Sequence, residues 1–356
     1  MMLNEQRADE FWQFIYDRHL IWYKRYILKQ NPPWTNDDIF LNFKFTNVYR
    51  MLDRGSLYLH NEILSKIQDD NTKFLLIVFH RFYNKIETLE SIKPAFNILN
   101  DNNTPEVIDY LQHLLYDQEQ KMGLFTNAHM VNSIKSWKVD DYPGIPYYAK
   151  DSKSNRFMKG FLETHKNRES YVNKLRNTNT GKEAFDIIKG CAPGIGDFVA
   201  YEIFCDLIYT SILKQFDEDS FVNIGPGCSY ALDIISPGPS SNTYDKYINI
   251  LNHLFEHQFD YYNKNTIGFP YITFQYLQLP YLTKRCIEHS LCEFYKYFKT
   301  KNLIGTGRPR NGYQATINNK EYLGKSTDSY LKLLNSEITK DIRVNIVSQP
   351  FEFGPV

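Results

Sequence analysis

Two segments far apart in the chain set charged side chains among aromatic ones, and these residues could do chemistry. The first, residues 41–54, is dense in both kinds: Lys44, Phe45, Asn47, Tyr49, Arg50, Asp53 and Arg54. The second, residues 283–298, carries Glu293 and Lys296 beside aromatic residues. On a helix, Asn47, Arg50 and Arg54 would share one face. A buried helix tolerates such charges only when they are paired. We therefore expect either a structural network of ion pairs or a polar site, and the residue types leave both open.

The stretch 186–203 has the composition of an anion-binding turn between two helices. An apolar helix end runs into Pro193, Gly194, Ile195 and Gly196, and a second helix is expected from Asp197. The two glycines permit a tight turn, and Ile195 can pack between the helices. The unpaired amides at the start of the second helix, with those of the turn, form a ready anion site. An ordinary corner between two helices is the alternative.

The composition favours a globular protein of a reducing compartment. The 356 residues are enough for one large or two modest domains. Lysine plus arginine and aspartate plus glutamate both count 41, which argues against a bulk polycation but permits a local basic groove. Five cysteines without a C-x-x-C argue against a structural zinc or iron–sulfur cluster. A polar N-terminus and the lack of a membrane-length apolar run predict a soluble, cytoplasmic protein with no membrane partner.

Helical spacing of apolar residues runs through most of the chain and predicts an all-α fold. The consecutive apolar residues 74–79 suit a central core helix or a buried strand, and the helical spacing elsewhere favours the helix. The Gly-Pro-Gly of residues 225–227 opens a helix over 228–235. Further helices are expected over 244–262 and 283–298. The end of the chain loses this periodicity, and we expect a less regular tail there.

Several catalytic motifs are missing from the chain. Residues 324–327 read Gly-Lys-Ser-Thr, like the end of a phosphate-binding loop, but position 319 is Asn. No P-loop kinase domain is therefore expected. The patterns of serine hydrolases, zinc proteases and zinc deaminases are missing as well.

Five groups of residues, taken together in chain order, resemble one family. They are Arg18-His19 with Pro33-Trp34-Thr35, residues 44–54, residues 80–88, residues 224–227 and residues 288–297. These groups are similar to the helical, glycosylase-like domain shared by phage 5-hydroxymethyluracil DNA kinases and the α-glutamyl/putrescinyl thymine pyrophosphorylases. The resemblance implies a helix-hairpin-helix DNA-glycosylase-like domain over residues 1–311, followed by an extension over 312–356. The stretch 186–203 resembles the hairpin of DNA repair glycosylases, in which the bound anion is a DNA phosphate.

The resemblance implies a function in DNA base hypermodification. Kinase members of the family carry an additional P-loop domain, and its absence here favours the pyrophosphorylase branch. Such a transferase displaces pyrophosphate from 5-pyrophosphoryloxymethyluracil in DNA with the amine of an amino acid or a polyamine. The alternatives are a DNA glycosylase acting on a modified base and a non-catalytic DNA-binding module. Base excision is less favoured, because Asn223, Gly225 and Pro226 stand where a repair glycosylase places its aspartate.

The implied reaction assigns roles to particular residues. Cations must meet the departing pyrophosphate, and the candidates are Arg18, Lys44, Arg50, Arg54 and Lys296. A base must deprotonate the amine, for which Asp53 and Glu293 lead and His19 follows. Phe45 is a candidate stacking wall for a flipped base, and Asn47 and Arg81 are candidates for recognising the amine donor.

The DNA contacts expected from the hairpin and from a basic loop near residue 308 are Lys189, Gly194, Ile195, Gly196, Arg308 and Arg310. Double-stranded DNA carrying a modified thymine and an amino acid or polyamine are the expected partners. A divalent metal could accompany the pyrophosphate, although no cluster of metal ligands is recognisable. We further expect the segments 44–54 and 288–296 to be two helices that face each other across one site.

Overall fold

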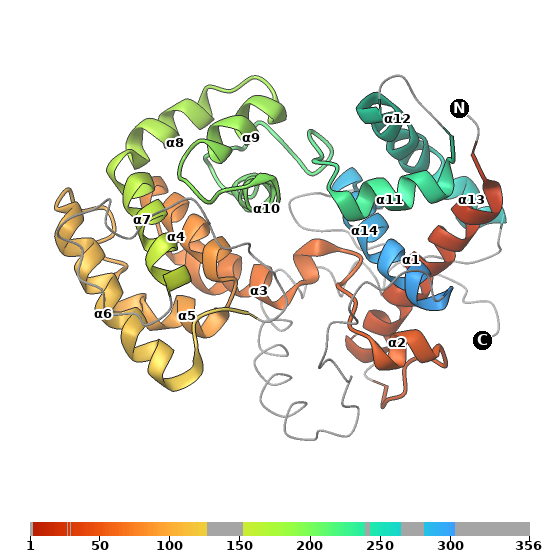
Figure 1. The fold of residues 1–356 in the computed structure, drawn as a ribbon, viewed down its shortest axis with the longest axis horizontal. Helices are drawn as coiled ribbons and strands as arrows, with labels where there is room; N and C mark the ends of the chain where they lie inside the picture. Colours follow the sequence, from red (N-terminus) through yellow and green to blue (C-terminus); the bar gives the residue numbers. More distant parts are fainter. Residues whose placement is uncertain are drawn as a thin grey trace. The chain divides into compact units, whose positions relative to one another are not determined.

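The computed structural model describes residues 3–26, 28, 30–126, 152–238, 243–264 and 281–302. Within these residues the secondary structure is entirely helical, with no strand (Figure 1). The predicted all-α fold is thereby confirmed. The predicted extension over 312–356 and the loop carrying Arg308 and Arg310 lie outside the described residues.

The chain divides into two compact units. Unit 1 combines both ends of the chain, Met1–Arg54 and Val222–Val356, and unit 2 is the continuous segment Gly55–Phe221. A short helix, α3 (Arg54–Leu57), begins at the last residue of unit 1 and continues into unit 2.

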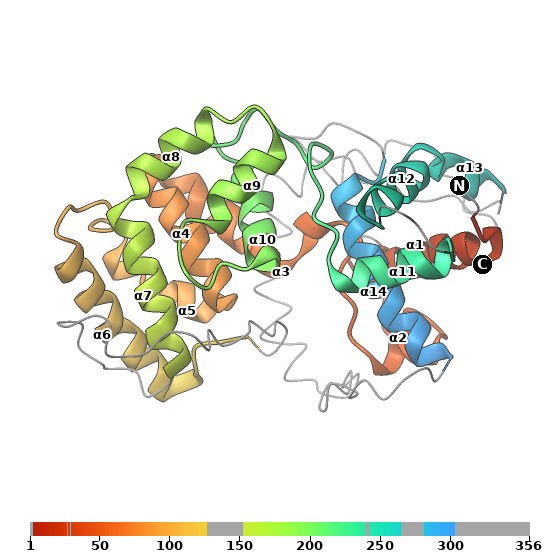
Figure 2. The ribbon, with the colours of Figure 1, turned by 45° about the horizontal axis from the view of Figure 1, so that its top comes forward.

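Unit 2 is built around α4 (Asp70–Tyr83), whose residues 74–79 are fully buried. The helices that pack against α4 are α5 (Ile86–Ser91), α7 (Ser152–Lys166), α8 (Arg168–Arg176) and α10 (Asp197–Leu207), as Figure 2 shows. The remaining elements are η2 (Tyr58–Ile63), η3 (Leu64–Lys66), η4 (Lys93–Ala95), α6 (Thr104–Met122) and α9 (Gly181–Lys189). An apolar run this long forms a helix because neighbours cover it on all sides. The predicted core helix is confirmed, with Asp69 as its N-cap.

Unit 1 is organised by α14 (Lys284–Lys301). It packs against α1 (Glu5–Tyr26), α2 (Asp38–Asn42), α11 (Pro226–Ile235) and α12 (Thr243–Glu256). A further helix, α13 (Gln258–Lys264), follows α12. The helix predicted over 244–262 is therefore broken in two near residue 257. The helix predicted over 228–235 forms, and it starts two residues earlier, at Pro226.

The prediction of a helix through residues 44–54 is wrong. Helix α2 ends at Asn42, residues 43–49 are not helical, and only a 3₁₀ turn, η1 (Arg50–Leu52), follows. Side chains of two distant helices bond the backbone of this segment instead, because Arg18 of α1 donates to the Phe45 carbonyl and Lys296 of α14 donates to the Lys44 carbonyl. These bonds satisfy backbone groups that a helix would otherwise pair internally.

Candidate functional site

The non-helical segment 43–49 forms a loop that is held between α1 and α14. On the α1 side, the Arg18 guanidinium donates to the Phe45 carbonyl oxygen at 3.0 Å and to Asn47 Oδ1 at 2.8 Å. The Asn47 amide nitrogen in turn donates to the Leu52 carbonyl oxygen at 2.8 Å. Arg18 and Asn47 thus stabilise the loop conformation through a shared hydrogen bond. The spacing of these residues in the sequence did not predict that bond.

On the α14 side, one carboxylate and one ammonium group hold the same loop. The Thr46 amide donates to Glu293 Oε2 at 3.1 Å, and the Thr46 hydroxyl bonds the His289 ring. Lys296 Nζ lies 2.7 Å from Glu293 Oε2, 2.8 Å from the Lys44 carbonyl oxygen and 4.5 Å from the centroid of the Phe45 ring. The two charged segments therefore meet, as a loop against a helix and through direct hydrogen bonds.

The charged side chains of Lys296 and Glu293 differ in their exposure to solvent. The Lys296 side chain is 40% exposed and the Glu293 side chain 14%. Lys296 can thus meet an anion from solvent while it still bonds the loop. Glu293 accepts from a backbone amide and an ammonium group, and its side chain is partly exposed to solvent.

Phe45 and His19 are packed into the protein interior. The Phe45 side chain is buried in an aromatic cluster with Phe40 (5.1 Å between ring centroids) and Tyr297 (6.1 Å). The His19 ring is 1% exposed and lies 5.6 Å from Trp22 and 5.1 Å from Tyr49. In these positions both residues contribute to packing, and a role in stacking or proton transfer stays a prediction.

Arg50 and Asp53 form a weaker pair at the end of the loop. Arg50 Nη1 lies 3.9 Å from Asp53 Oδ2, with the arginine side chain 2% exposed and the aspartate side chain 37% exposed. Asp53 thus presents a carboxylate to solvent beside a buried cation. The side chain of the neighbouring Arg54 lies outside the described part of the structure.

Two further carboxylates of unit 1, Asp17 on α1 and Asp37 at the start of α2, interact with each other. The Tyr297 hydroxyl donates to Asp37 Oδ2 at 2.6 Å, while Asp37 Oδ1 caps α2. Burial raises the pKa of Asp17 to about 6; the Asp37 charge adds to this rise, and a hydrogen bond from Gln13 opposes it. A base with a pKa near neutrality is well matched to proton transfer. No sequence signal marked Asp17, because its burial and its approach to Asp37 arise only on folding.

The predicted hairpin is present in unit 2, between α9 and α10. Gly194 has φ of +96°, a left-handed conformation that favours glycine. Ile195 is buried, as a member of the hydrophobic core of unit 2. Gly196 is the N-cap of α10, with φ −81° and ψ 177°, and no side chain caps the helix there. A Cβ atom added at Gly196 would meet nothing within 4 Å, so the surface beside this end of α10 has room for a ligand.

Two other features define the hairpin. Lys189 Nζ lies 2.6 Å from Asp197 Oδ1, which ties the end of α9 to the start of α10 on the surface. Gly160 of α7 approaches the turn so closely that a Cβ atom there would lie 2.8 Å from the Pro193 carbonyl oxygen. Helix α7 therefore packs against the turn at Pro193, while Gly196 at the other end of the turn is exposed to solvent.

Arg81, predicted to recognise the amine donor, is buried in unit 2. Its guanidinium donates to the two oxygens of Asp206 at 2.6 and 2.7 Å and lies 3.0 Å from Glu202 Oε2. His60 Nε2 lies 3.2 Å from Asp206 as well. Burial by itself would raise the pKa of Asp206, but Arg81 and His60 outweigh it and hold that pKa well below its ordinary value. This network joins α4 and η2 to the hairpin helix α10.

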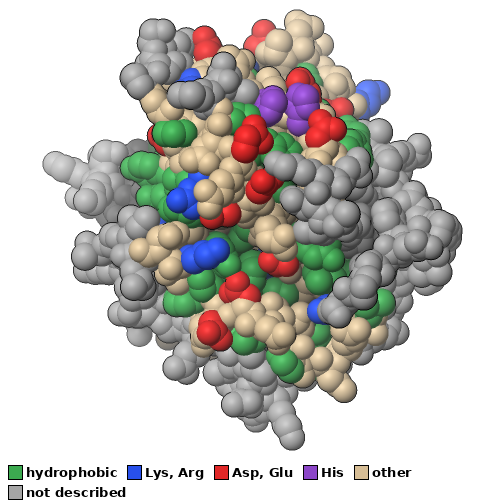
Figure 3. Space-filling model, turned by 90° about the vertical axis from the view of Figure 1, so that its right-hand side faces the viewer, with side chains coloured by type: hydrophobic (Ala, Val, Ile, Leu, Met, Phe, Trp, Pro, Cys, Tyr) green, Lys and Arg blue, Asp and Glu red, His purple; other side chains and the backbone are tan. Residues whose placement is uncertain are grey.

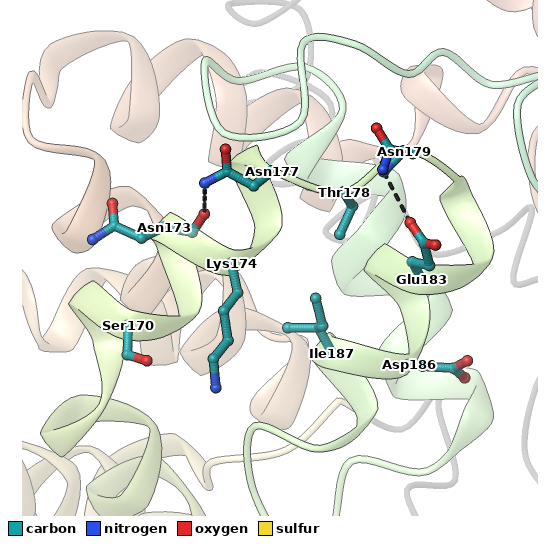
Figure 4. A pocket seen from close by; sticks show the side chains of 9 residues that line it. All are labelled: Ser170, Asn173, Lys174, Asn177, Thr178, Asn179, Glu183, Asp186 and Ile187. Atoms are coloured by element: carbon teal, nitrogen blue, oxygen red, sulfur yellow. Dashed lines mark hydrogen bonds between the residues drawn. The ribbon is translucent and has the colours of Figure 1, made fainter.

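An open polar hollow lies on the surface between α8 and α9. Its volume is about 790 Å³, and Figure 4 shows Lys174 with the side chains around it. Three of its nine lining residues carry side-chain amides: Asn173, Asn177 and Asn179. Glu183 is already engaged in the capping box of α9, and Asp186 is paired with Lys182. None of the residues predicted for the site lines this hollow.

Charges of both signs are interspersed on the face shown in Figure 3, which carries no continuous basic stripe among its coloured residues. This matches the zero net charge of the chain. Within the described ranges, no group of three or more His, Cys, Asp or Glu residues has the geometry to hold a metal ion. Among those same residues, every helix is too short or too polar to cross a membrane.

The chain is similar to known proteins over much of its length. A family model described as "5-hmdU DNA kinase, helical domain" matches residues 5–304. A 5-hmdU DNA kinase of Bacillus phage SP10 is 26% identical over 238 residues, which cover 64% of this chain and 36% of the relative. The chain thus spans about a third of the length of that relative. No solved structure matches the chain.

Proposed function

Because the chain belongs to the family of the helical domain of 5-hmdU DNA kinases, we propose that it acts in DNA base hypermodification. The substrate is DNA that carries a thymine substituted at its 5-methyl carbon. The resemblance reported above suggests two tasks for such a domain, holding the DNA and acting on the modified base. The hairpin of unit 2 supports the first task, and the loop site of unit 1 supports the second.

For the reaction we propose a transfer that releases pyrophosphate. The amine nitrogen of an amino acid or polyamine forms a bond to the 5-methylene carbon of the base, while the bond from that carbon to the pyrophosphate oxygen breaks. The amine loses one proton, and pyrophosphate leaves with the electron pair. The protein must therefore supply a proton acceptor and cations for the leaving group.

The observation that carries this proposal is the meeting of the charged loop with α14. Glu293 and Lys296 lie 2.7 Å apart on α14, and Arg18 reaches the same loop from α1. In the proposed reaction Glu293 accepts the proton of the amine, and Lys296 and Arg18 meet the pyrophosphate. Asp53 and Asp17 are further carboxylates of unit 1 that can serve as the proton acceptor.

The test is an assay on defined DNA. A duplex with one 5-pyrophosphoryloxymethyluracil is incubated with the protein and a mixture of amines, digested to nucleosides and weighed by mass spectrometry. Transfer predicts a heavier nucleoside together with free pyrophosphate. A free base and an abasic site would identify a glycosylase instead. A parallel reaction of 5-hydroxymethyluracil DNA with ATP measures kinase activity, and a phosphorylated base there would argue against transfer.

A matched pair of variants tests the role of Glu293. Glu293→Gln removes the charge while it keeps the size of the side chain, and we expect a loss of turnover of roughly 100-fold or more, the contribution typical of a general base. Glu163→Gln is the control, since Glu163 forms the same kind of pair on α7, three residues before Lys166 at 3.6 Å. Equal turnover of the two variants would remove Glu293 from the mechanism.

A second candidate function is binding without catalysis. It is favoured by one observation: Arg18, Glu293 and Lys296 all have hydrogen-bond partners within the fold, as structural residues do. In that case the protein binds the modified duplex and leaves every nucleoside mass unchanged.

A further inference from the structure

An exposed aromatic stack lies on the surface of unit 1, apart from the loop site described above. Tyr230 of α11 and Tyr295 of α14 stack with ring centroids 5.0 Å apart and planes inclined by 25°. Tyr230 is 54% exposed, the most exposed large hydrophobic side chain in the described ranges. Tyr230 is thus open to solvent, where a flat ligand can stack on its ring.

The backbone holds the two rings in place. A Cβ atom at Gly227 would lie 2.3 Å from Cys292 Sγ, so α11 and α14 approach very closely at this point. Tyr230 and Tyr295 each stand three residues further along their helices. The stack therefore sits one turn beyond the closest approach of two packed helices. Because the two rings already stack on each other, a ligand that binds them removes less side-chain freedom than it would from two separate tyrosines.

The charge next to the stack is positive. Lys299, one turn after Tyr295 on α14, places its Nζ 5.4 Å from the centroid of the Tyr295 ring. Among the residues that the structure describes, no carboxylate forms an ion pair with Lys299. The acidic residue of α11 is Asp233. Its carboxylate already forms an ion pair with Lys246 at 2.9 Å and accepts a hydrogen bond from the Tyr247 hydroxyl at 2.8 Å.

We propose that Tyr230, Tyr295 and Lys299 form a platform for an unpaired DNA nucleotide. The base extends the stack on the open face of Tyr230, and Lys299 meets a backbone phosphate. Stacked aromatics beside a cation suit single-stranded nucleic acid, because every base offers a flat face and every nucleotide a negative charge. A protein partner would instead need a contiguous apolar patch of several hundred Å². The proposal rests on the proposed function only in taking DNA as the ligand, and it does not depend on the transfer reaction.

The experiment is a double-mutant cycle in which one change is Tyr230→Leu in the protein and the other is the removal of one base from the DNA. Fluorescence anisotropy measures the Kd of a labelled 12-nucleotide strand of abasic positions with one central thymidine, and of the same strand with that thymidine also replaced by an abasic position, for the parent protein and for Tyr230→Leu. Removing the stacked base should weaken binding to the parent on the order of tenfold. The same removal should have no effect on Tyr230→Leu, whereas Tyr230→Phe should restore the parent behaviour. Tyr116→Leu on α6, with a side chain 36% exposed, is the control for loss of a surface tyrosine.

Salt dependence tests the lysine separately. Lys299→Met should reduce the slope of log Kd against log salt concentration by about 0.7, the value for one phosphate contact with a single strand. If the abasic position weakens the parent and Tyr230→Leu equally, the platform is refuted. A change of oligomeric state in Tyr230→Leu without any change in DNA binding would identify a protein interface and would refute it as well. The binding measurements do not require the transfer reaction. They can therefore support or refute the nucleotide platform even if the transfer assay shows no reaction.

Discussion

Replacing Gly196 by aspartate is the sharpest test of the hairpin as a phosphate site, because the structure predicts little effect on folding. Gly196 has φ −81° and ψ 177°, which any L-residue adopts without strain. Its Cβ position is free of neighbours within 4 Å. Aspartate is among the preferred residues at a helix N-cap, so the free energy of unfolding should stay within a few tenths of a kcal/mol or rise slightly.

DNA binding should respond in the opposite sense. The new carboxylate would accept from the amides that we expect to hold a DNA phosphate, and it would repel that phosphate. Two unit charges about 4 Å apart repel by about 1 kcal/mol in bulk water and by about 4 kcal/mol near a protein surface. The expected increase in Kd for duplex DNA is therefore roughly 5-fold to 1,000-fold.

Gly196→Asn supplies the matched control, because asparagine caps a helix as well as aspartate does but carries no charge. Kd is measured by anisotropy with a 20-base-pair duplex at several salt concentrations, since phosphate contacts make binding salt-dependent. Thermal unfolding of each variant confirms that folding is intact. If the aspartate and asparagine variants bind DNA equally well, the turn is an ordinary corner and the reasoning fails.

Three further predictions concern charges in both units. Asp197→Asn removes the anion that pairs with Lys189 at the hairpin, so duplex affinity should rise severalfold in an anisotropy titration, and a fall would contradict the assignment. Arg81→Met leaves the buried Asp206 carboxylate without its main partner and should destabilise the protein by about 3–5 kcal/mol in urea unfolding. In the parent, the lowered pKa of Asp206 means that this contribution is present above about pH 4 and is lost as the pH falls further. Asp17 has a raised pKa of about 6, so its contribution to stability is lost as the pH rises from about 4 to 6. Asp17→Asn should therefore raise the melting temperature at pH 7.5 but not at pH 3.5, and equal shifts at both values would contradict this.

Local patterns determined much of this protein. Helical spacing sufficed for the all-α fold, because an apolar stripe of period 3.6 can be buried only by a helix. The run at residues 74–79 became the buried centre of α4, the alternative that the helical spacing of the rest of the chain favoured over a buried strand. The hairpin was readable for the same reason, since Gly194 and Gly196 stand where the turn needs a left-handed residue and an open N-cap. These features depend on residues a few positions apart.

Tertiary contacts decided the rest. Residues 44–47 were expected on a helix and are instead a loop, because Glu293 and Lys296 bond its backbone from about 250 positions away in the chain. Arg81 meets Asp206 at a separation of 125 residues, which helical periodicity does not register. The pKa of Asp17 depends on burial and on the approach of Asp37, which exist only once α1 and α2 are packed. Sequence spacing reports neighbours on one helix, whereas each of these properties is set by side chains brought together from separate helices.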